Sequence, residues 1–266
     1  MAEYIKFDGN VLWHGNGSTP EAVFEAEEDI NGRVHVIEDL GDRYANLYRD
    51  TKAENRAYTA TFTLKATPTV SLQVLKAQWE QMHRARGGLR TLERQTDTGR
   101  ILQLSVVPET PQWSEEHTSW QQVVQAYTSP DPFWQSAAEQ SASAAYDGET
   151  PVALTCVNDG DEPCWVRFDL ADAIEDPKIE LADEWELEFG LTMGAGDALA
   201  IVCKTPATAW YTESGEDPTR AYGYRTAATL FRKTKLAVGS NALSLSATSG
   251  TGTCVAYWRE LFDALR

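Results

Sequence analysis

Hydrophobic and polar residues alternate along much of the second half of the chain, with the period of two that is typical of half-buried strands. The clearest case is residues 185–189, Trp-Glu-Leu-Glu-Phe. We interpret Glu184, Glu186 and Glu188 accordingly as the solvated face of a sheet and not as catalytic carboxylates. Further strand-like runs recur between turn signals, a pattern that predicts a β-sandwich: residues 164–170, 199–203, 221–225, 243–247 and 254–258.

One segment has the helical period instead. Leu72, Leu75, Trp79 and Met82 fall on one face of a helix, Ser71 is a suitable N-cap, and Gly87-Gly88 would end it. The pattern predicts one amphipathic helix over residues 70–86.

The rest of the first half consists of short apolar runs between turn signals. Hairpin-type dipeptides occur at Asp8-Gly9, Asn16-Gly17 and Asn31-Gly32. Strands are predicted at residues 33–37, 58–64, 89–93, 101–107 and 113–127. A sheet with one helix packed on it indicates an α+β first domain.

The best domain boundary follows Ser136, because residues 136–150 are small, polar and poor in core-forming side chains. They form either a linker or an edge strand. Just before them stands Asp131-Pro132-Phe133-Trp134, in which Pro132 favours an extended backbone. This tetrapeptide is either a strand entry at the seam between domains or an aromatic anchor in a core. The expected domains are residues 1–136 and 137–266.

The chain carries a net charge of −17, which argues against a surface that binds nucleic acid tightly. Residues 71–100 are the one locally basic stretch, and they form either a solvated helix face or a contact surface for an acidic neighbour. No apolar run approaches the length of a membrane span and the N-terminus lacks a signal-peptide pattern. We therefore expect a soluble protein, made in a cytoplasm and not inserted in a membrane.

All four cysteines lie in the second half, without zinc-binding spacing. Cys156 and Cys164 bracket a turn and could face each other across a hairpin, although buried free thiols are the expected state in a cytoplasm.

Motifs for catalysis and cofactor binding are absent from the sequence, so we assign no catalytic, cofactor or metal residue. Residues 158–162 do not fit the calcium-loop pattern. His14, His35 and His83 are isolated in the sequence and indicate no site. Trp210 and Tyr211 could stack on a sugar ring, or they could pack in a core or hairpin.

The order of these features resembles the distal tail protein family of long-tailed, siphovirus-type bacteriophages. The resemblance rests on Asp131-Pro132-Phe133-Trp134 after the helix, on the Gly239-Ser240-Asn241 turn before a late strand, and on the aromatic penultimate strand at residues 255–258. The residues that match its motifs are Asp131, Pro132, Phe133, Trp134, Gly239 and Asn241.

The resemblance implies a mainly β fold. Residues 1–136 would form a ring-forming, tail-tube-like α+β domain with one helix, and residues 137–266 a galectin-like β-sandwich. It further implies a structural hub without enzyme activity or cofactor, located at the tail tip of the virion after synthesis in the host cytoplasm. The hub would be a homo-hexamer that joins the tail tube protein to a tail-associated baseplate protein and a receptor-binding protein. DNA would pass through the ring without specific binding.

A ring subunit needs two different complementary patches, because ring interfaces are heterologous. Charge alone suggests one pair: Arg84, Arg86 and Arg90 on one subunit against Glu25, Glu27 and Glu28 on the next.

Two other functions remain open. A carbohydrate-binding module or adhesin could use the same sandwich, and it would show saturable glycan binding by the 137–266 fragment. A glycoside hydrolase or other wall-degrading enzyme would lose turnover when a single carboxylate is changed.

Overall fold

The chain forms two compact units in a computed structural model that describes residues 4–14, 22–38, 47–67, 69–84, 88–96, 98–148, 151–182, 184–204, 207–226, 229 and 231–263. Unit 1 comprises Met1–Ala137 together with Phe262–Arg266, and unit 2 comprises Ala138–Leu261. The first crossing between the units lies next to the boundary expected after Ser136. The return of the last residues to unit 1 has no counterpart in the sequence prediction.

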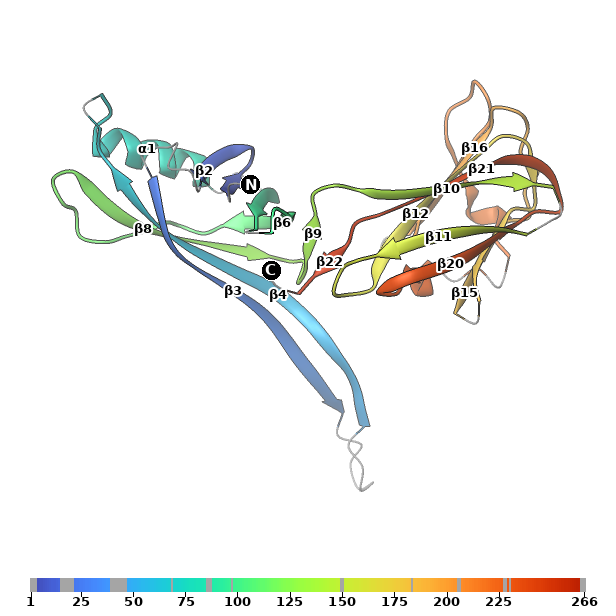
Figure 1. Ribbon diagram of the computed structural model, residues 1–266, viewed down its shortest axis with the longest axis horizontal. Helices are drawn as coiled ribbons and strands as arrows, with labels where there is room; N and C mark the ends of the chain where they lie inside the picture. Colours follow the sequence, from blue (N-terminus) through green and yellow to red (C-terminus); the bar gives the residue numbers. More distant parts are fainter. Residues whose placement is uncertain are drawn as a thin grey trace. The chain divides into compact units, whose positions relative to one another are not determined.

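Unit 1 is built around one antiparallel sheet whose strands follow the order β2-β1-β5-β6-β8-β4-β3 (Figure 1). The short strand β7 pairs with β8, and β9 pairs with β6 and β22. The elements are β1 Tyr4–Phe7, β2 Asn10–His14, β3 Ala22–Glu38, β4 Leu47–Lys65, α1 Leu72–His83, β5 Arg90–Gln95, β6 Ile101–Pro108, β7 Gln112–Trp113, β8 Trp120–Ser129, β9 Trp134–Ser136 and β22 Leu261–Phe262.

The hairpin dipeptides have different outcomes. Asp8-Gly9 forms the turn between β1 and β2, with φ of 50° and 79°, as predicted. Asn16-Gly17 lies outside the described residues. The turn predicted at Asn31-Gly32 is wrong, because β3 continues through both residues and only its register shifts, between Asn31 and Arg33. Continuous pairing with β4 overrides the local turn preference there.

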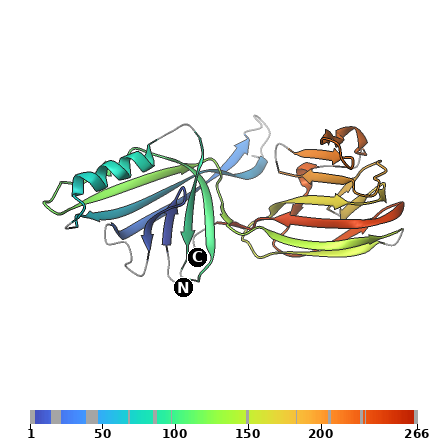
Figure 2. The same ribbon diagram turned by 90° about the horizontal axis from the view of Figure 1, so that it is seen from above.

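Helix α1 starts as predicted and ends earlier. Ser71 Oγ accepts a hydrogen bond from the backbone N–H of Val74 at 3.4 Å, and the buried side chains include Leu72, Leu75 and Trp79. The helix ends at His83 and not at residue 86; Gly87 lies outside the described residues. The helix lies along the part of the sheet formed by β4 and β8 (Figure 2).

The strand predicted at residues 113–127 is split. Residues 114–119 separate β7 from β8, and Ser114 Oγ accepts a hydrogen bond from the backbone N–H of Gln122 at 3.1 Å. The chain reverses direction between the two strands, because β7 pairs antiparallel with β8, with Gln112 opposite Val124 and Trp113 opposite Val123.

Unit 2 is a β-sandwich. Its larger sheet has the order β10-β21-β12-β16-β17-β18, and its smaller sheet has the order β11-β20-β14-β15. The elements are β10 Gln140–Asp147, β11 Val152–Asn158, β12 Cys164–Ala171, β13 Ile174–Glu175, β14 Lys178–Leu181, β15 Trp185–Glu188, β16 Ala198–Val202, β17 Thr208–Thr212, β18 Thr219–Arg220, η1 Ala221–Tyr224, η2 Phe231–Lys233, β19 Lys235–Leu236, β20 Gly239–Ser246 and β21 Ser249–Trp258.

The structure of unit 2 decides three of the predictions made from the sequence. Most of residues 136–150 belong to the edge strand β10 and not to a linker. The strand predicted at residues 221–225 is wrong, because η1 is a 3₁₀ helix. The alternation in β15 is confirmed: Trp185 and Leu187 are buried, and Glu186 lies 3.0 Å from Lys178 on the outer side.

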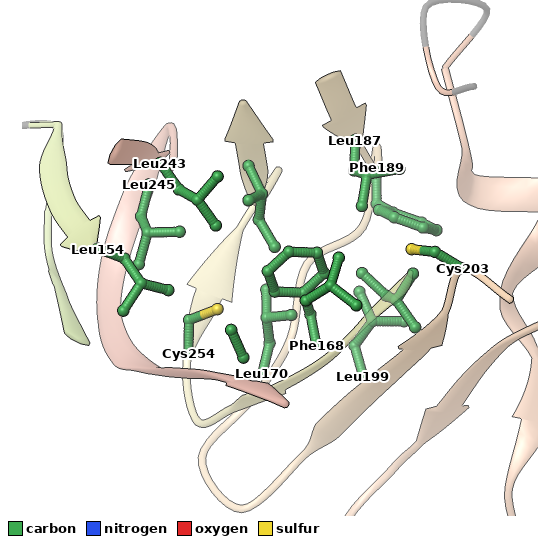
Figure 3. Close-up of a cluster of buried hydrophobic side chains, with 14 of the residues drawn as sticks. Leu154, Phe168, Leu170, Leu187, Phe189, Leu199, Cys203, Leu243, Leu245 and Cys254 are labelled. Carbon is green, nitrogen blue, oxygen red and sulfur yellow. The ribbon is translucent and has the colours of Figure 1, made fainter. Parts of the chain in front are cut away.

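The core of unit 2 lies between its two sheets. Leu154, Leu243 and Leu245 from the smaller sheet point toward Phe168 and Leu170 from the larger one (Figure 3). All of these side chains are at most 2% exposed, as a closely packed interior requires.

The cysteines are buried and free, as expected for all four. Cys156 and Cys164 do not face each other across a hairpin, because β11 and β12 belong to different sheets. Burial raises the pKa of both thiols to about 12, so they are protonated and unreactive in the folded protein.

Candidate assembly interface

Strands β3 and β4 of unit 1 continue as a two-stranded ribbon beyond the rest of the sheet (Figure 1). β8 pairs only with residues Arg56–Lys65 of β4. From Leu47 to Asn55, β4 pairs with β3 alone among the described strands. We call this part of β4, together with residues 33–38 of β3 that pair with it, the ribbon.

The ribbon has the properties of a surface that is completed by a partner. Isolated two-stranded hairpins are at best marginally stable in water, and an edge strand presents unpaired backbone groups. β3 is the edge strand of the sheet, and its register with β4 shifts at three places. Such bulges bend and twist a strand pair. Among the described strands none pairs with the outer edge of β3, so this edge offers backbone hydrogen-bonding groups to a partner.

The acidic residues selected from the sequence lie on β3. Glu27 is opposite Ala60 and Glu28 is opposite Thr59, while Glu25 coincides with the first register shift. Their side chains are outside the described part of the chain. In the strand order, β5, β6, β8 and β4 precede β3, so this acidic run and Arg90 on β5 occupy separate regions of unit 1.

The described arginines of the predicted interface lie on either side of the turn after α1. Arg84 directly follows the helix and is exposed. Arg90 is held within its own subunit: its Nη1 donates to the carbonyl oxygen of Met82 at 2.6 Å, and its guanidinium lies over the ring of Phe7. Arg86 is outside the described residues. Of these two described arginines, Arg84 is thus the better placed for contact with another subunit.

Two hollows flank the C-terminal half of α1. One, of about 710 Å³, is lined by Glu80, Arg84 and the loop from Pro108 to Gln112. The other, of about 300 Å³, is lined by Arg90 together with Asp8 and residues of α1. Both arginines therefore border concave surface, which can receive a protruding segment of a partner.

A buried polar network holds the helix to the sheet beside these hollows. His83 Nδ1 lies 2.9 Å from the carbonyl oxygen of Trp79, and His83 Nε2 lies 2.8 Å from the hydroxyl of Tyr127. The imidazole also stacks on Phe7, with ring centroids 4.8 Å apart. Burial lowers the pKa of His83 to about 4, with a smaller contribution in the same direction from Arg90. This histidine is structural and neutral at physiological pH.

The Asp-Pro-Phe-Trp segment closes unit 1. Trp134 is fully buried, begins β9 and meets Tyr58 edge-on at 5.6 Å between centroids. Asp131 accepts hydrogen bonds from the side chain of Gln135 and from the backbone N–H of Phe133. The segment is thus both a core anchor and a strand entry at the end of the unit. This explains the residue types but identifies no partner.

The Gly-Ser-Asn motif has a local structural explanation. Gly239 has φ of +95°, a conformation that side chains disfavour. Asn241 is buried; its Oδ1 accepts from the N–H of Ala237 at 2.9 Å, and its Nδ2 donates to the carbonyl oxygens of Ala237 and Gly239. The amide therefore fixes the turn that leads into β20.

The C-terminal residues return to unit 1 through contacts that the sequence analysis missed. Phe262 is buried, and the guanidinium of Arg100 lies 4.6 Å from its ring centroid. Arg56, also buried, donates through Nη1 to the carbonyl oxygen of Phe262 at 3.5 Å and through Nη2 to that of Asp263. A buried arginine at the root of the ribbon thus binds the end of the chain.

Within the described ranges, no three histidine, cysteine or acidic side chains are grouped in a way that could hold a metal ion. None of the helices in those ranges is long and apolar enough to cross a membrane.

Comparison with solved structures shows the fold. The chain superposes on the crystal structure of the Dit hub protein of phage SPP1, with a TM-score of 0.66 and 10% sequence identity, over 98% of this chain and 100% of the other. That protein is described as a paradigm of the hub adsorption apparatus in phages that infect Gram-positive bacteria. The mainly β fold implied by the sequence resemblance is therefore confirmed along nearly the whole chain.

Chains of the activated phage p2 baseplate, solved with Sr or with Ca, also align, at TM-scores of 0.47 and 0.48 and identities of 8% and 9%. The alignments cover 96% of this chain and 97% of each baseplate chain. Both scores are below 0.5, so of these three structures the SPP1 protein alone is used to assign the fold. No protein-family model and no curated protein matches the sequence.

Proposed function

We propose that this chain is a structural hub of a long-tailed phage tail tip and not an enzyme. Six copies form a ring through unit 1. The ring connects the tail tube protein to a tail-associated baseplate protein and a receptor-binding protein, and DNA passes through it without specific binding. The observation that carries the proposal is the shared fold with the SPP1 hub protein, which extends through both units.

The ribbon supports a ring in particular. A ring subunit must offer one surface that reaches out and a different one that receives it. The ribbon supplies an outward-reaching edge. The acidic run lies on the same edge strand, opposite the part of β4 that also pairs with β8, and Arg84 borders an open hollow elsewhere on unit 1. The net charge of −17 favours passage of DNA over adhesion to it.

Electron microscopy of the purified full-length protein, with class averages examined for rotational symmetry, tests the proposal. We expect six-fold rings with an open centre. Monomers at every concentration would contradict it.

Charge reversal tests the interface separately. We expect Arg84→Glu with Arg86→Glu to disrupt the ring, and Glu27→Lys with Glu28→Lys to restore it in the combined variant, because the attraction is then reversed in sign. Lys233→Glu, an exposed cation of unit 2, is the matched control. Rings that persist after reversal of both arginines would refute this interface while leaving the hub proposal standing.

Carbohydrate binding is the second candidate, and one observation favours it. Trp210 points outward with 36% of its surface exposed, whereas Tyr211 is partly buried and donates its hydroxyl to Asp197. Of the two aromatic residues considered for sugar stacking, Trp210 is the exposed one, and the guanidinium of Arg220 lies 5.7 Å from the centroid of its ring.

A further inference from the structure

The outer face of the larger sheet in unit 2 carries a row of side chains that crosses all six strands. Directly opposed residues of antiparallel strands point to the same side of a sheet, so the strand register defines the row. We call it the outer row; from one edge to the other it consists of Ser143, Val255, Asp169, Ala200, Trp210 and Arg220. Its immediate neighbours along the strands, such as Phe168 and Leu199, are buried in the core.

An aromatic ring and a carboxylate stand on either side of a small residue in this row. Trp210 and Asp169 lie on β17 and β12, and Ala200 on β16 lies between them. Neighbouring strands are about 4.8 Å apart, which places the two backbones about 10 Å from each other. Because Ala200 contributes only a methyl group, the indole and the carboxylate can contact the same small molecule.

The carboxylate is part of a loose ionic group. Arg167 Nη2 lies 3.5 Å from Asp169 Oδ2 and 3.8 Å from Glu139 Oε2, and the guanidinium stacks on Tyr257 at 4.3 Å from the ring centroid. Charge-assisted hydrogen bonds are shorter, about 2.7–2.9 Å, so these pairs leave bonding capacity unused. Asp169 and Arg167 are 41% and 39% exposed. A ligand hydroxyl can donate to the carboxylate and accept from the guanidinium at the same time.

Four charged side chains in or beside the outer row cancel one another. Arg167 and Arg220 are balanced by Asp169 and Glu139, on a chain whose overall charge is −17. An anionic polymer gains nothing from such a surface and is repelled by the rest of the molecule. The surface suits an uncharged ligand that has both hydroxyl groups and an apolar face.

We propose that the outer row binds an uncharged saccharide. One sugar ring lies over Ala200 with its C–H face against the indole of Trp210, where the negative face of the aromatic ring attracts the C–H groups. The hydroxyls on its other side hydrogen-bond to Asp169 and Arg167. The inference rests on unit 2 alone and does not depend on ring formation.

Saturation-transfer NMR on the full-length protein tests the site, with glucose, galactose, N-acetylglucosamine and their disaccharides as probes. We expect saturable binding with dissociation constants in the millimolar range, because one ring on an open face buries few atoms. Saturation is expected to be strongest at the C–H protons of one sugar face.

Three variants locate the site. Trp210→Ala and Asp169→Asn each weaken binding about tenfold, through loss of the stacking surface and of a charged hydrogen-bond acceptor. Ala200→Tyr abolishes binding while leaving every hydrogen-bonding group in place. The control is Tyr224→Ala, which removes an aromatic side chain that is 43% exposed but lies outside the row and therefore leaves binding unchanged. Equal melting temperatures and protected cysteines verify that each variant is folded.

Several results would overturn the proposal. These are absence of saturation transfer from every neutral probe, equal affinity in wild type and all variants, or preference for a sulfated probe. A change of oligomeric state in Ala200→Tyr without any sugar binding would also overturn it and would show that the face docks a protein. If the protein binds sugar but forms no rings, the hub proposal is rejected and the proposal of this sugar site is kept.

Discussion

The two units treat buried polar groups differently. In unit 2, the buried amides of Asn241 and Asn158 bond to backbone groups of turns and of distant strands, and the space between the sheets is apolar. In unit 1, the ionisable side chains of His83 and Arg56 lie within or beside the core itself, where they also join elements that are distant in sequence. Unit 2 thus resembles a self-contained sandwich, whereas unit 1 depends on a few polar contacts and carries a ribbon whose outer edge is unpaired among the described strands. The difference suggests that unit 2 is stable by itself and that unit 1 gains stability on assembly.

Removal of the largest buried side chain of unit 1 tests this contrast most strongly. Trp134→Ala deletes a fully buried indole, and such changes cost about 3–5 kcal/mol. We expect the melting transition of unit 1 to shift down or disappear in calorimetry. The cysteines, all in unit 2, should stay protected from thiol reagents. Trp210→Ala, which removes a partly exposed indole, should change neither transition appreciably. Simultaneous exposure of the thiols in Trp134→Ala would show that the units unfold together.

Acid should distinguish the units next. The pKa of His83 falls from 6.5 to about 4 on folding, so as pH drops the unfolded state takes up the proton first. The free energy of unfolding of unit 1 therefore decreases from pH 6.5 downward, by about 3 kcal/mol once pH 4 is reached. All four histidines precede residue 138, so unit 2 has no histidine that could destabilise it in this way as the pH falls. Burial raises the pKa of Asp169, which acts in the opposite direction there.

Urea unfolding between pH 7 and 4 measures the acid effect. In His83→Phe, which keeps a ring at the stacking position, the additional loss of stability in this pH window should vanish. An unchanged pH slope would show that carboxylates, and not this imidazole, account for the acid sensitivity.

The turn amide of unit 2 should have a smaller, local effect. Asn241→Ala leaves the backbone N–H of Ala237 and the carbonyl of Gly239 without their partner, a loss of about 1–3 kcal/mol. We expect faster thiol labelling of unit 2 and an unchanged transition for unit 1. Ser240→Ala, an exposed neighbour, is the control. An equal effect of the two substitutions would show that the turn does not depend on this amide.

The smallest effect is expected on the outer surface of the smaller sheet. Lys178 lies within 3.0 Å of both Glu180 and Glu186, yet its side chain is 31% exposed. Exposed ion pairs contribute at most about 1 kcal/mol, so Lys178→Ala should hardly move the melting temperature, and added salt should reduce the difference further. A large destabilisation would mean that unit 2 is less self-contained than its core suggests.

The sequence predicted the elements that local pattern determines. The face of α1 from Leu72 to Trp79 and the alternation in β15 follow from burial on one side only, and both are found. The prediction of a turn at Asn31-Gly32 was wrong, because the same dipeptide can form a bulge when a long partner strand is available. The ribbon and the return of Phe262 were invisible for a related reason: each depends on pairing between residues far apart in the sequence.

For the candidate interface, the sequence could predict which charged residues take part but not where the fold places them. Glu25, Glu27 and Glu28 fall together on β3, but nothing in their local sequence reveals that β3 is an edge strand. For Arg90, the sequence could not show that its guanidinium is engaged with Met82 and Phe7 of the same chain. Of the outer row, the sequence indicated Trp210 alone, since Asp169 and Trp210 are brought to either side of Ala200 only by the strand register.

The return of the chain to unit 1 makes unit 2 an insertion. Strand β9 leads out of unit 1, β22 leads back, and these two strands pair with each other. The two ends of the inserted segment therefore lie side by side, the arrangement in which domain insertion is best tolerated. Replacing residues 138–260 by another module with neighbouring ends alters no strand pairing of unit 1. The architecture thus permits unit 2 to be exchanged as a cassette while the strand pairing of unit 1 stays the same.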